Sequence, residues 1–508
     1  MNGKLTRRNL MKGIGAGLAI AAGTRALPAA AARAAAASPA RPNIILVMTD
    51  DQGYGELACH GNKIIKTPNL DAMYAKSLRF TDFHVSPTCA PTRCSIMTGR
   101  HEFRSGVTHT IYERERMGLA AITLPSLLKA AGYTTGIFGK WHLGDQEPYQ
   151  PNNRGFDEVF IHGGGGIGQS YRGSCGDAPG NKYFDPAIRH NGTFVKTTGY
   201  CTDIFFTQAM RWVKQVKKGP FFAYITTNAP HGPLQCPEKY YKPYMDVGLP
   251  ESDARFYGMI TNIDDNMGIL LKKLDQWKLL DNTLVVFMTD NGSARAGSRR
   301  RRKPNAPAQQ PLYNAGMRGK KGTPYEGGIR VPAFFYWKGH TPTAVDCKAL
   351  TAHVDLLPTF VELAGANLPE KVKLDGRSLV PLMKTPQTTW PDRYVFTHLG
   401  RWRKGQAAQA KYAQCSIRSQ RFHLVNNTEL YDLPADPGEK TNVADKHPEV
   451  VADLQKAYDQ WWSEVLPAMV NEDAPVPKAN PFKLLYNKQA QSPKGIPAWP
   501  VHPTVEEL

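Results

Sequence analysis

Four short apolar runs, each followed at once by polar residues, constrain the fold of this chain of 508 residues more than any other feature. With the residues that follow them, they read "NIILVMTDD" (43–51), "YTTGIFGKWHLG" (133–144), "FFAYITTNAPHGP" (221–233) and "TLVVFMTDNG" (283–292). Short uninterrupted apolar runs separated by longer segments are typical of strands that are buried on both faces. The sequence therefore predicts an α/β fold with a large, mostly parallel sheet flanked by helices.

The polar residues after these runs are expected to meet at one edge of the sheet. Ligands of parallel sheets bind beyond the carboxyl ends of the strands. The four strand ends would gather three aspartates, one asparagine, two histidines and one lysine, namely Asp50, Asp51, Lys140, His142, His231, Asp290 and Asn291. This convergence predicts the position of a functional site.

Two of the strand ends carry acidic pairs after almost identical runs, "LVMTDD" and "VFMTDN". Either pair alone is more readily explained as a turn that ends a strand. Asp50 and Asp51 at one end, with Asp290 and Asn291 at the other, favour a site for a divalent cation. Oxygen donors without a thiolate or imidazole suit Ca²⁺ or Mg²⁺ better than Zn²⁺.

The stretch "SPTCAPTRCSIMTGR" (86–100) contains two cysteines and predicts a helix, because Pro91 suits a first helical turn. Cys89 would lie at the helix N-terminus, where exposed N–H groups favour an anion or a nucleophile. Arg93, four residues later, shares that face and can hold a sulfate or phosphate oxygen. Cys94 is better explained as a small buried residue.

The N-terminal sequence resembles an export signal of the twin-arginine type. Arg7 and Arg8 precede an uncharged stretch (13–24) and Ala-rich sequence that ends at Ala37. A disordered basic tail is the alternative. The apolar stretch is shorter than the ~20 residues that span a bilayer, and no later segment reaches that length. We expect a signal over residues 1–37, no membrane span, and a periplasmic or secreted protein.

The net charge of +19 indicates an anionic partner. Removing residues 1–37, which contain six Lys and Arg and no acid, leaves +13. The candidates are a sulfated or carboxylated glycan, which the basic charge favours, and an anionic surface; no nucleic acid is expected because nucleic-acid-binding motifs are missing from the sequence. The basic run Arg299–Lys303 is either a solvated loop or a rim that attracts a polyanion.

The pattern of expected secondary structure changes after "DGRSLVPLM" (375–383), where short strands with turns and then a helix are expected. We predict a catalytic domain over residues 38–390. A smaller C-terminal α+β domain with an antiparallel sheet and a Pro-rich tail is expected over residues 391–508.

The segment "CAPTRCSIMTGR" matches the sulfatase signature, a Cys-x-Pro-x-Arg core followed by Thr-Gly-Arg. The chain resembles the type I, formylglycine-dependent sulfatases, which are arylsulfatase-like members of the alkaline-phosphatase superfamily. The resemblance runs from about Pro42 to at least Asn442. It includes, in that family's order, "NIILVMTDDQGYGELACHG", "GKWHLG", "TDNG", "GKKGTPYEGGIRVP" and "LYDLPADPGEKTNVA".

This resemblance implies an alkaline-phosphatase-like fold and hydrolysis of sulfate esters, on a sulfated carbohydrate or on aryl sulfates. It implies that Cys89 becomes formylglycine (3-oxoalanine) through a transient encounter with the formylglycine-generating enzyme. With a twin-arginine signal, this step would occur in the cytoplasm, before the folded chain is exported. One hydroxyl of the hydrate would attack sulfur, and loss of the second proton would then expel sulfate.

The resemblance also implies a role for each candidate site residue. Ca²⁺, with Mg²⁺ as the alternative, would be bound by Asp50, Asp51, Asp290, Asn291 and the modified residue 89. Arg93 would orient the hydrate, Lys140 would bridge it to the sulfate, and His142 would take the second proton. His231 and Lys321 would bind the ester and help to protonate the departing alcohol; Lys320 is a substitute for Lys321, but only Lys321 directly precedes "GTPYEGG". The family has a further polar site residue, for which Ser170 is a candidate.

Two other functions stay open at this point. One is a phosphonate or phosphodiester hydrolase of the same superfamily. The other is a catalytically silent protein that binds sulfated glycans, although a binding protein does not need the modification signature.

Overall fold

The computed structural model describes residues 41–296, 312–500 and 508. The predicted export signal (1–37) and the basic run Arg299–Lys303 lie outside the described residues. Within the described ranges, no helix combines the length and the apolar character that crossing a membrane requires.

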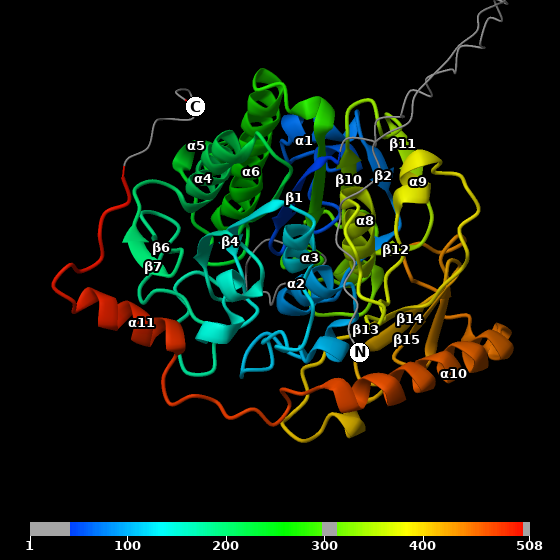
Figure 1. Cartoon of the computed structure of the whole chain (residues 1–508). Coiled ribbons are helices and arrows are strands. Elements are labelled where there is room, and N and C mark those ends of the chain that lie inside the picture. Colours follow the sequence, from blue (N-terminus) through cyan, green and yellow to red (C-terminus); the bar gives the residue numbers. More distant parts are fainter. Residues whose placement is uncertain (1–40, 297–311, 501–507) are drawn as a thin grey trace, which may run out of the picture. The chain divides into compact units, whose positions relative to one another are not determined.

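A ten-stranded sheet forms the centre of the fold, in the order β11-β2-β10-β9-β1-β8-β4-β5-β6-β7 (Figure 1). Its strands are β1 (Asn43–Thr49), β2 (Leu78–Phe80), β4 (Thr134–Lys140), β5 (Glu158–His162), β6 (Ala187–His190), β7 (Thr193–Lys196), β8 (Phe221–Thr226), β9 (Thr283–Thr289), β10 (Ala333–Tyr336) and β11 (Val345–Cys347). The four apolar runs are β1, β4, β8 and β9, which are neighbours in the order β9-β1-β8-β4 and pair in parallel. Antiparallel pairs flank this centre on both sides, so the sheet as a whole is mixed.

Helices cover both faces of the sheet, which explains why the central strands are apolar without interruption (Figure 1). Ile44 and Leu46 point to one face, where they share a hydrophobic cluster with residues of α2 (Cys89–Thr98), α3 (Leu124–Ala130) and α8 (Leu356–Ala364). Ile45 and Val47 point to the other face, with residues of α1 (Pro68–Tyr74), α4 (Cys201–Val216) and α6 (Glu251–Gln276). The remaining α-helices before the second sheet are α5 (Glu238–Asp246), α7 (Glu326–Ile329) and α9 (Val380–Lys384).

A separate antiparallel sheet follows near the C-terminus, as the sequence predicts. It consists of β13 (Val395–His398), β14 (Cys415–Arg418), β15 (Phe422–Val425) and β16 (Glu429–Asp432). Helix α10 (Pro448–Val465) packs its apolar face on this sheet through a cluster that includes Ile417, Leu424 and Trp461. Helix α11 (Pro481–Ala490) lies beyond it in the chain, and β3 (Phe83–His84) and β12 (Thr351–Ala352) form a small third sheet.

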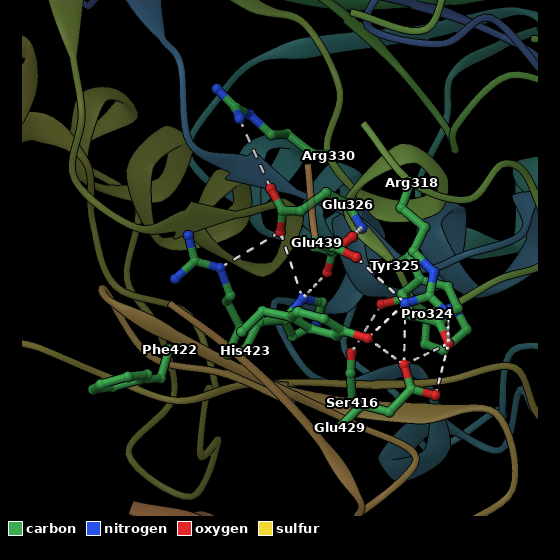
Figure 2. Close-up of polar contacts among 12 residues, drawn as sticks. Arg318, Pro324, Tyr325, Glu326, Arg330, Ser416, Phe422, His423, Glu429 and Glu439 are labelled. Atoms are coloured by element: carbon green, nitrogen blue, oxygen red, sulfur yellow. Dashed lines mark hydrogen bonds and ion pairs between the residues drawn. The ribbon is translucent and has the colours of Figure 1, made fainter. Parts of the chain in front are cut away.

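The segment Arg318–Arg330, which carries Lys321, is fixed to the second sheet around the buried side chain of Glu326 (Figure 2). His84 Nε2 lies 2.9 Å and Arg418 Nε lies 3.5 Å from Glu326 Oε1. Burial alone would raise the pKa of Glu326, but the charges of His84 and Arg418 hold it well below its usual value. Glu326 is therefore an ionised carboxylate that contacts residues of two sheets, His84 and Arg418.

Further polar contacts hold the same segment on its other side (Figure 2). The backbone N–H of Glu326 donates to Glu439 Oε2 at 2.9 Å, and His423 Nδ1 lies 2.6 Å from Glu439 Oε1. The Tyr325 hydroxyl donates to Glu429 Oε2 at 3.1 Å. These contacts couple the position of Lys321 to the second sheet, although nothing in the sequence pattern indicates it.

We expect the substitution Glu326→Ala to lower the free energy of unfolding by about 3–5 kcal/mol, because it removes the buried carboxylate that His84 and Arg418 share. The control is Arg318→Ala in the same segment, because the side chain of Arg318 is 42% exposed in its ion pair with Glu429. An exposed pair of this kind contributes about 1 kcal/mol or less. Urea denaturation of both variants measures the difference, and equal losses would contradict the assignment.

Candidate active site

The ends of the four central strands bring the predicted site residues together, as the parallel arrangement requires. Asp50 and Asp51 follow β1, Lys140 ends β4, and Asp290 and Asn291 follow β9. All five are buried. The acidic pairs interlock directly, because the backbone N–H of Asp51 donates to Asp290 Oδ1 at 3.1 Å and Asn291 Nδ2 donates to Asp51 Oδ1 at 3.1 Å.

Each of the three buried carboxylates has its own cationic partner. Lys140 Nζ lies 2.6 Å from Asp50 Oδ2, and Lys321 Nζ lies 2.5 Å from Asp51 Oδ1. The third pair joins Arg93 to Asp290 at 2.8 Å.

The pKa values of these carboxyls diverge. Burial raises the pKa of Asp50 to about 6 and that of Asp290 to about 7, and the neighbouring acids add to both shifts. Burial also acts to raise the pKa of Asp51, but Lys321 and His231 hold it below its usual value. Burial therefore outweighs the nearby cations at Asp50 and Asp290, whereas the cationic groups outweigh burial at Asp51.

Two oxygen atoms of this cluster suit a divalent cation. Asp50 Oδ1 and Asn291 Oδ1 are buried and accept no hydrogen bond from any described residue. A carboxylate oxygen of Asp50, one of Asp290 and the Cys89 Sγ all lie within 4.8 Å of one another. Unpaired buried oxygens are costly unless a ligand satisfies them, and hard oxygen donors fit Ca²⁺ or Mg²⁺.

Cys89 is the first residue of α2, as the sequence predicts. It is 3% exposed and packs against the acidic cluster from the helix N-terminus. Burial acts to raise the pKa of its thiol, but Lys140 and Lys321 bring it below the usual value. Cys94 is fully buried in the main hydrophobic cluster, and burial raises the pKa of its thiol, so it is an inert packing residue. All eight cysteines lie in the described ranges and are free.

Arg93 is fully buried and ties α2 to the ends of three strands. It donates to the Lys140 carbonyl at 3.1 Å, to the Thr226 hydroxyl and to Asp290 Oδ2 at 2.8 Å. Thr226 is a contact residue that the sequence analysis misses, because a threonine at the end of an apolar run carries no distinctive signal. Arg93 therefore fixes the geometry of α2 against the acidic cluster.

His142 is oriented as a base. Its Nε2 lies 2.9 Å from the Thr110 carbonyl, which can only accept, so the proton is on Nε2. Its buried Nδ1 has no hydrogen-bond partner among the described residues. Burial lowers the pKa of His142 well below its usual value, and Lys140 adds to the shift. The ring is thus neutral, with a free lone pair on Nδ1.

His231 and Lys321 are the more open members of the site, with side chains 20% and 19% exposed. His231 Nδ1 donates to the Gly232 carbonyl at 2.8 Å, and Nε2 lies 3.8 Å from Asp51 Oδ2. Burial lowers the pKa of His231, and the charge of Asp51 offsets only part of this shift. The ring is therefore neutral at neutral pH. These two residues mark the side from which a substrate enters.

The backbone of the glycine run 163–166 lies so close to side chains of the site that a side chain on Gly165 or Gly166 would collide with them. A Cβ on Gly165 would lie 2.8 Å from His142 Nε2, and one on Gly166 would lie 2.8 Å from Gln169 Nε2 and 3.0 Å from His231 Cε1. The Gln169 amide therefore lies next to both histidines. The sequence analysis names the adjacent Ser170 and misses Gln169, because the loop has no pattern that fixes which side chain turns inward.

Comparison with known proteins finds similarity to sulfatases over most of the chain. The family model described as "Sulfatase" matches residues 42–366, and the one described as "N-sulphoglucosamine sulphohydrolase, C-terminal" matches residues 319–463. N-acetylgalactosamine-6-sulfatase of Homo sapiens is 32% identical over 382 residues, which cover 72% of this chain and 70% of that protein. Arylsulfatase A of Bos taurus is 31% identical over 490 residues, which cover 85% and 89%.

Among solved structures, that of Ps i-CgsB in complex with k-i-k-neocarrahexaose superposes with a TM-score of 0.72 at 30% identity. The match covers 83% of this chain and 93% of that protein. The predicted alkaline-phosphatase-like fold class is confirmed by the sheet arrangement and by these relatives.

Proposed function

This chain belongs to the sulfatase family and is a sulfuric ester hydrolase, and we propose that it removes sulfate from a sulfated carbohydrate by means of a formylglycine made from Cys89 and a divalent cation. The observation that carries the proposal is the position of Cys89. It lies at a helix N-terminus, beside three buried carboxylates and two lysines. The hydrated aldehyde would supply an attacking hydroxyl in place of the thiol.

The residues that would hold the cation are Asp50, Asp51, Asp290 and Asn291, together with the side-chain oxygen that replaces the Cys89 sulfur. The unpaired oxygens of Asp50 and Asn291 support this assignment. Ca²⁺ is preferred, with Mg²⁺ as the alternative. When bound, the cation supplies positive charge to the sulfuryl oxygens.

The remaining residues act on the sulfate group and on protons. Lys140 and Lys321, which bracket the acidic cluster, neutralise the sulfuryl charge, and Arg93 keeps residue 89 in place. His142 Nδ1 accepts the second proton of the hydrate, which its free lone pair supports. His231 and Lys321, at the open side, bind the ester and hydrogen-bond to the departing alcohol.

A carbohydrate substrate is supported by the relatives and by the charge of the chain. One relative is named N-acetylgalactosamine-6-sulfatase, and another was solved in complex with k-i-k-neocarrahexaose. A net charge of +19 favours an anionic partner.

We also propose export to the periplasm or medium by a twin-arginine signal (1–37), and conversion of Cys89 by the formylglycine-generating enzyme in the cytoplasm. The chain would divide into a catalytic domain (38–390) and a smaller C-terminal domain (391–508).

The decisive test is release of inorganic sulfate from a defined panel. The panel contains k-i-k-neocarrahexaose, glycosaminoglycan tetrasaccharides, the sulfated monosaccharides from which they are built, 4-nitrophenyl sulfate, a phosphodiester and a phosphonate monoester. We expect sulfate release from sulfated sugars and much slower turnover of the phosphorus esters. Faster turnover of a phosphorus ester would replace the proposal by the phosphohydrolase alternative, and binding without any turnover would indicate a silent glycan-binding protein.

Removal of divalent cations is expected to lower kcat at least about 100-fold. The thermal unfolding midpoint should fall as well, because a ligand that binds only the folded state stabilises it. Adding Ca²⁺ or Mg²⁺ back restores both values, and the cation that acts at lower concentration identifies the natural one. A chelated sample that elemental analysis shows to be metal-free, yet is fully active with an unchanged midpoint, would contradict the metal assignment.

A further inference from the structure

A pocket of about 420 Å³ is lined by residues on both sides of Thr110, whose carbonyl contacts His142 of the candidate active site. It is lined by the segment His109–Arg114 and by the loop after β13, and the lining residues that matter here are His109, Tyr112, Arg401, Trp402, Arg403 and Lys404. Its size is within the range of pockets that hold small ligands. The sequence analysis assigns no function to any of these residues.

The pocket is linked to the active site through one short stretch of backbone. The carbonyl of Thr110 accepts from His142 Nε2 at 2.9 Å, and the Thr110 hydroxyl lies 3.5 Å from Arg401 Nη2. The backbone N–H of Tyr112 donates to the Gly173 carbonyl in the loop that also carries Gln169. The 109–112 segment therefore contacts both the active-site residue His142 and the lining of this pocket.

The pocket carries a surplus of positive charge. Its one lining acid, Glu472, is already paired with Arg114 at 2.8 Å. Arg401, Arg403 and Lys404 are exposed, and among the described residues no carboxylate lies within ion-pair distance of their charged groups. Three cationic side chains that converge without acidic partners favour an anionic ligand.

The pocket also offers aromatic surface. The Tyr112 ring is 51% exposed. The Trp402 ring is held in place, because its indole N–H donates to Glu472 Oε2 at 2.5 Å and the Arg114 guanidinium lies 5.0 Å from the ring centre. Rings that are fixed and partly exposed bind the apolar faces of sugar units, while cations around them bind the charged substituents.

His109 adds a neutral donor. Its Nδ1 accepts hydrogen bonds from the backbone N–H groups of Thr110 at 2.8 Å and Ile111 at 3.2 Å. The proton of the neutral ring is therefore on Nε2. An N–H of this kind can donate to a sugar hydroxyl or to a sulfate oxygen.

We propose that this pocket binds a second, anionic sugar unit of the substrate, next to the unit whose sulfate ester is hydrolysed. The inference rests on the proposed function, since it takes the active site to be occupied by a sulfated sugar. Arg401, Arg403 and Lys404 bind the sulfate or carboxylate of the second unit, and Tyr112 and Trp402 contact its ring. The enzyme then prefers oligosaccharides that carry charge on neighbouring units over the corresponding monosaccharide.

The test compares the double variant Arg401→Ala/Arg403→Ala with wild type. The substrates are the sulfated oligosaccharide of the panel that wild type hydrolyses fastest and the sulfated monosaccharide of its reacting end. We expect the ratio of the two kcat/KM values to fall about ten-fold, because two charge-assisted contacts to the second unit are lost. Raising the salt concentration should lower the wild-type ratio in the same direction.

Two matched variants make this test specific. Lys217→Ala/Lys218→Ala removes the same charge from a pocket that also includes Asn43 and Pro220, at the opposite ends of β1 and β8, and should leave the ratio unchanged. Tyr112→Ala should lower the ratio, whereas Tyr112→Phe, which keeps the ring, should preserve it.

An unchanged ratio in Arg401→Ala/Arg403→Ala, or an equal fall in Lys217→Ala/Lys218→Ala, would overturn the inference. Equal kcat/KM values of the wild-type enzyme for the monosaccharide and the oligosaccharide would also overturn the inference, while the proposed function would stand. Absence of sulfate release from every substrate would instead refute the proposed function itself.

Discussion

The substitution Cys89→Ala is expected to abolish turnover, with kcat falling by at least about 10⁴-fold. The physical reason is that alanine has no thiol group that can be converted to the aldehyde, so the hydrate that carries the attacking hydroxyl cannot form. The buried carboxylates and lysines around residue 89 stay in place, so sulfated ligands should still bind. Sulfate release by ion chromatography gives the rate, and calorimetry with a sulfated oligosaccharide gives the affinity.

Cys94→Ala, in the same helix, is the matched control. Cys94 lies in the main hydrophobic cluster and is fully buried, so its loss costs packing and not chemistry. We expect full activity per folded molecule and a loss of stability of about 1–2 kcal/mol. Mass spectrometry of the peptide that contains both cysteines should find that residue 89 has exchanged its CH₂SH group for CHO. Active wild-type protein with an intact Cys89 thiol would contradict the mechanism, as would an active Cys89→Ala variant.

The second large effect is expected for Lys321→Met, for which kcat/KM should fall about 10²–10³-fold. Methionine keeps the length of the side chain but removes the charge that lies 2.5 Å from Asp51 Oδ1. The sulfuryl group then loses a cationic partner at the open side of the site. Because the Lys321 charge holds the pKa of Asp51 below its usual value, that pKa should rise in the variant.

Lys320→Met is the control for this prediction, since the two lysines are adjacent in sequence. Lys321 forms an ion pair with Asp51 of the acidic cluster, and no such pair with Asp51 occurs for Lys320 in the described structure. We expect activity within about three-fold of wild type for this change, because Lys320 is only partly buried and makes no ion pair with the acidic cluster among the described residues. Metal content by elemental analysis should stay the same in both variants. A loss of activity in Lys320→Met that matches that of Lys321→Met would show that the motif position alone does not identify the residue.

Much of the fold follows from the sequence because the central strands are buried on both faces. A strand such as Asn43–Thr49 must be apolar at every position when helices cover both sides, and it then stands out in the sequence without any alternation. The flanks of the sheet are less predictable. Strands β6 and β7 are four residues each and partly exposed, and short strands of this kind are fixed by their partners more than by their own residues.

The site likewise contains residues that the sequence predicts and residues that it does not. Asp50, Lys140 and Asp290 could be predicted because each ends or follows a strand, and the ends of parallel strands are brought together by the sheet itself. Gln169 could not, because it lies in a loop whose path depends on the room that Gly165 and Gly166 leave for the two histidine rings. The pocket at Arg401–Lys404 could not either, since it is formed by segments about 290 residues apart.

The sequence by itself therefore determined the sheet, the strand-end cluster and the helix that begins at Cys89, because periodicity and helix-start residues act over a few neighbouring positions. Only the tertiary structure decided which lysine pairs with Asp51, which ring nitrogen of His142 is free, and how the second sheet fixes the Lys321 segment through Glu326. Hydrogen bonds and ion pairs depend on distances of a few ångströms between residues that are far apart in the chain. Such distances are set when the whole chain packs, and no local pattern records them.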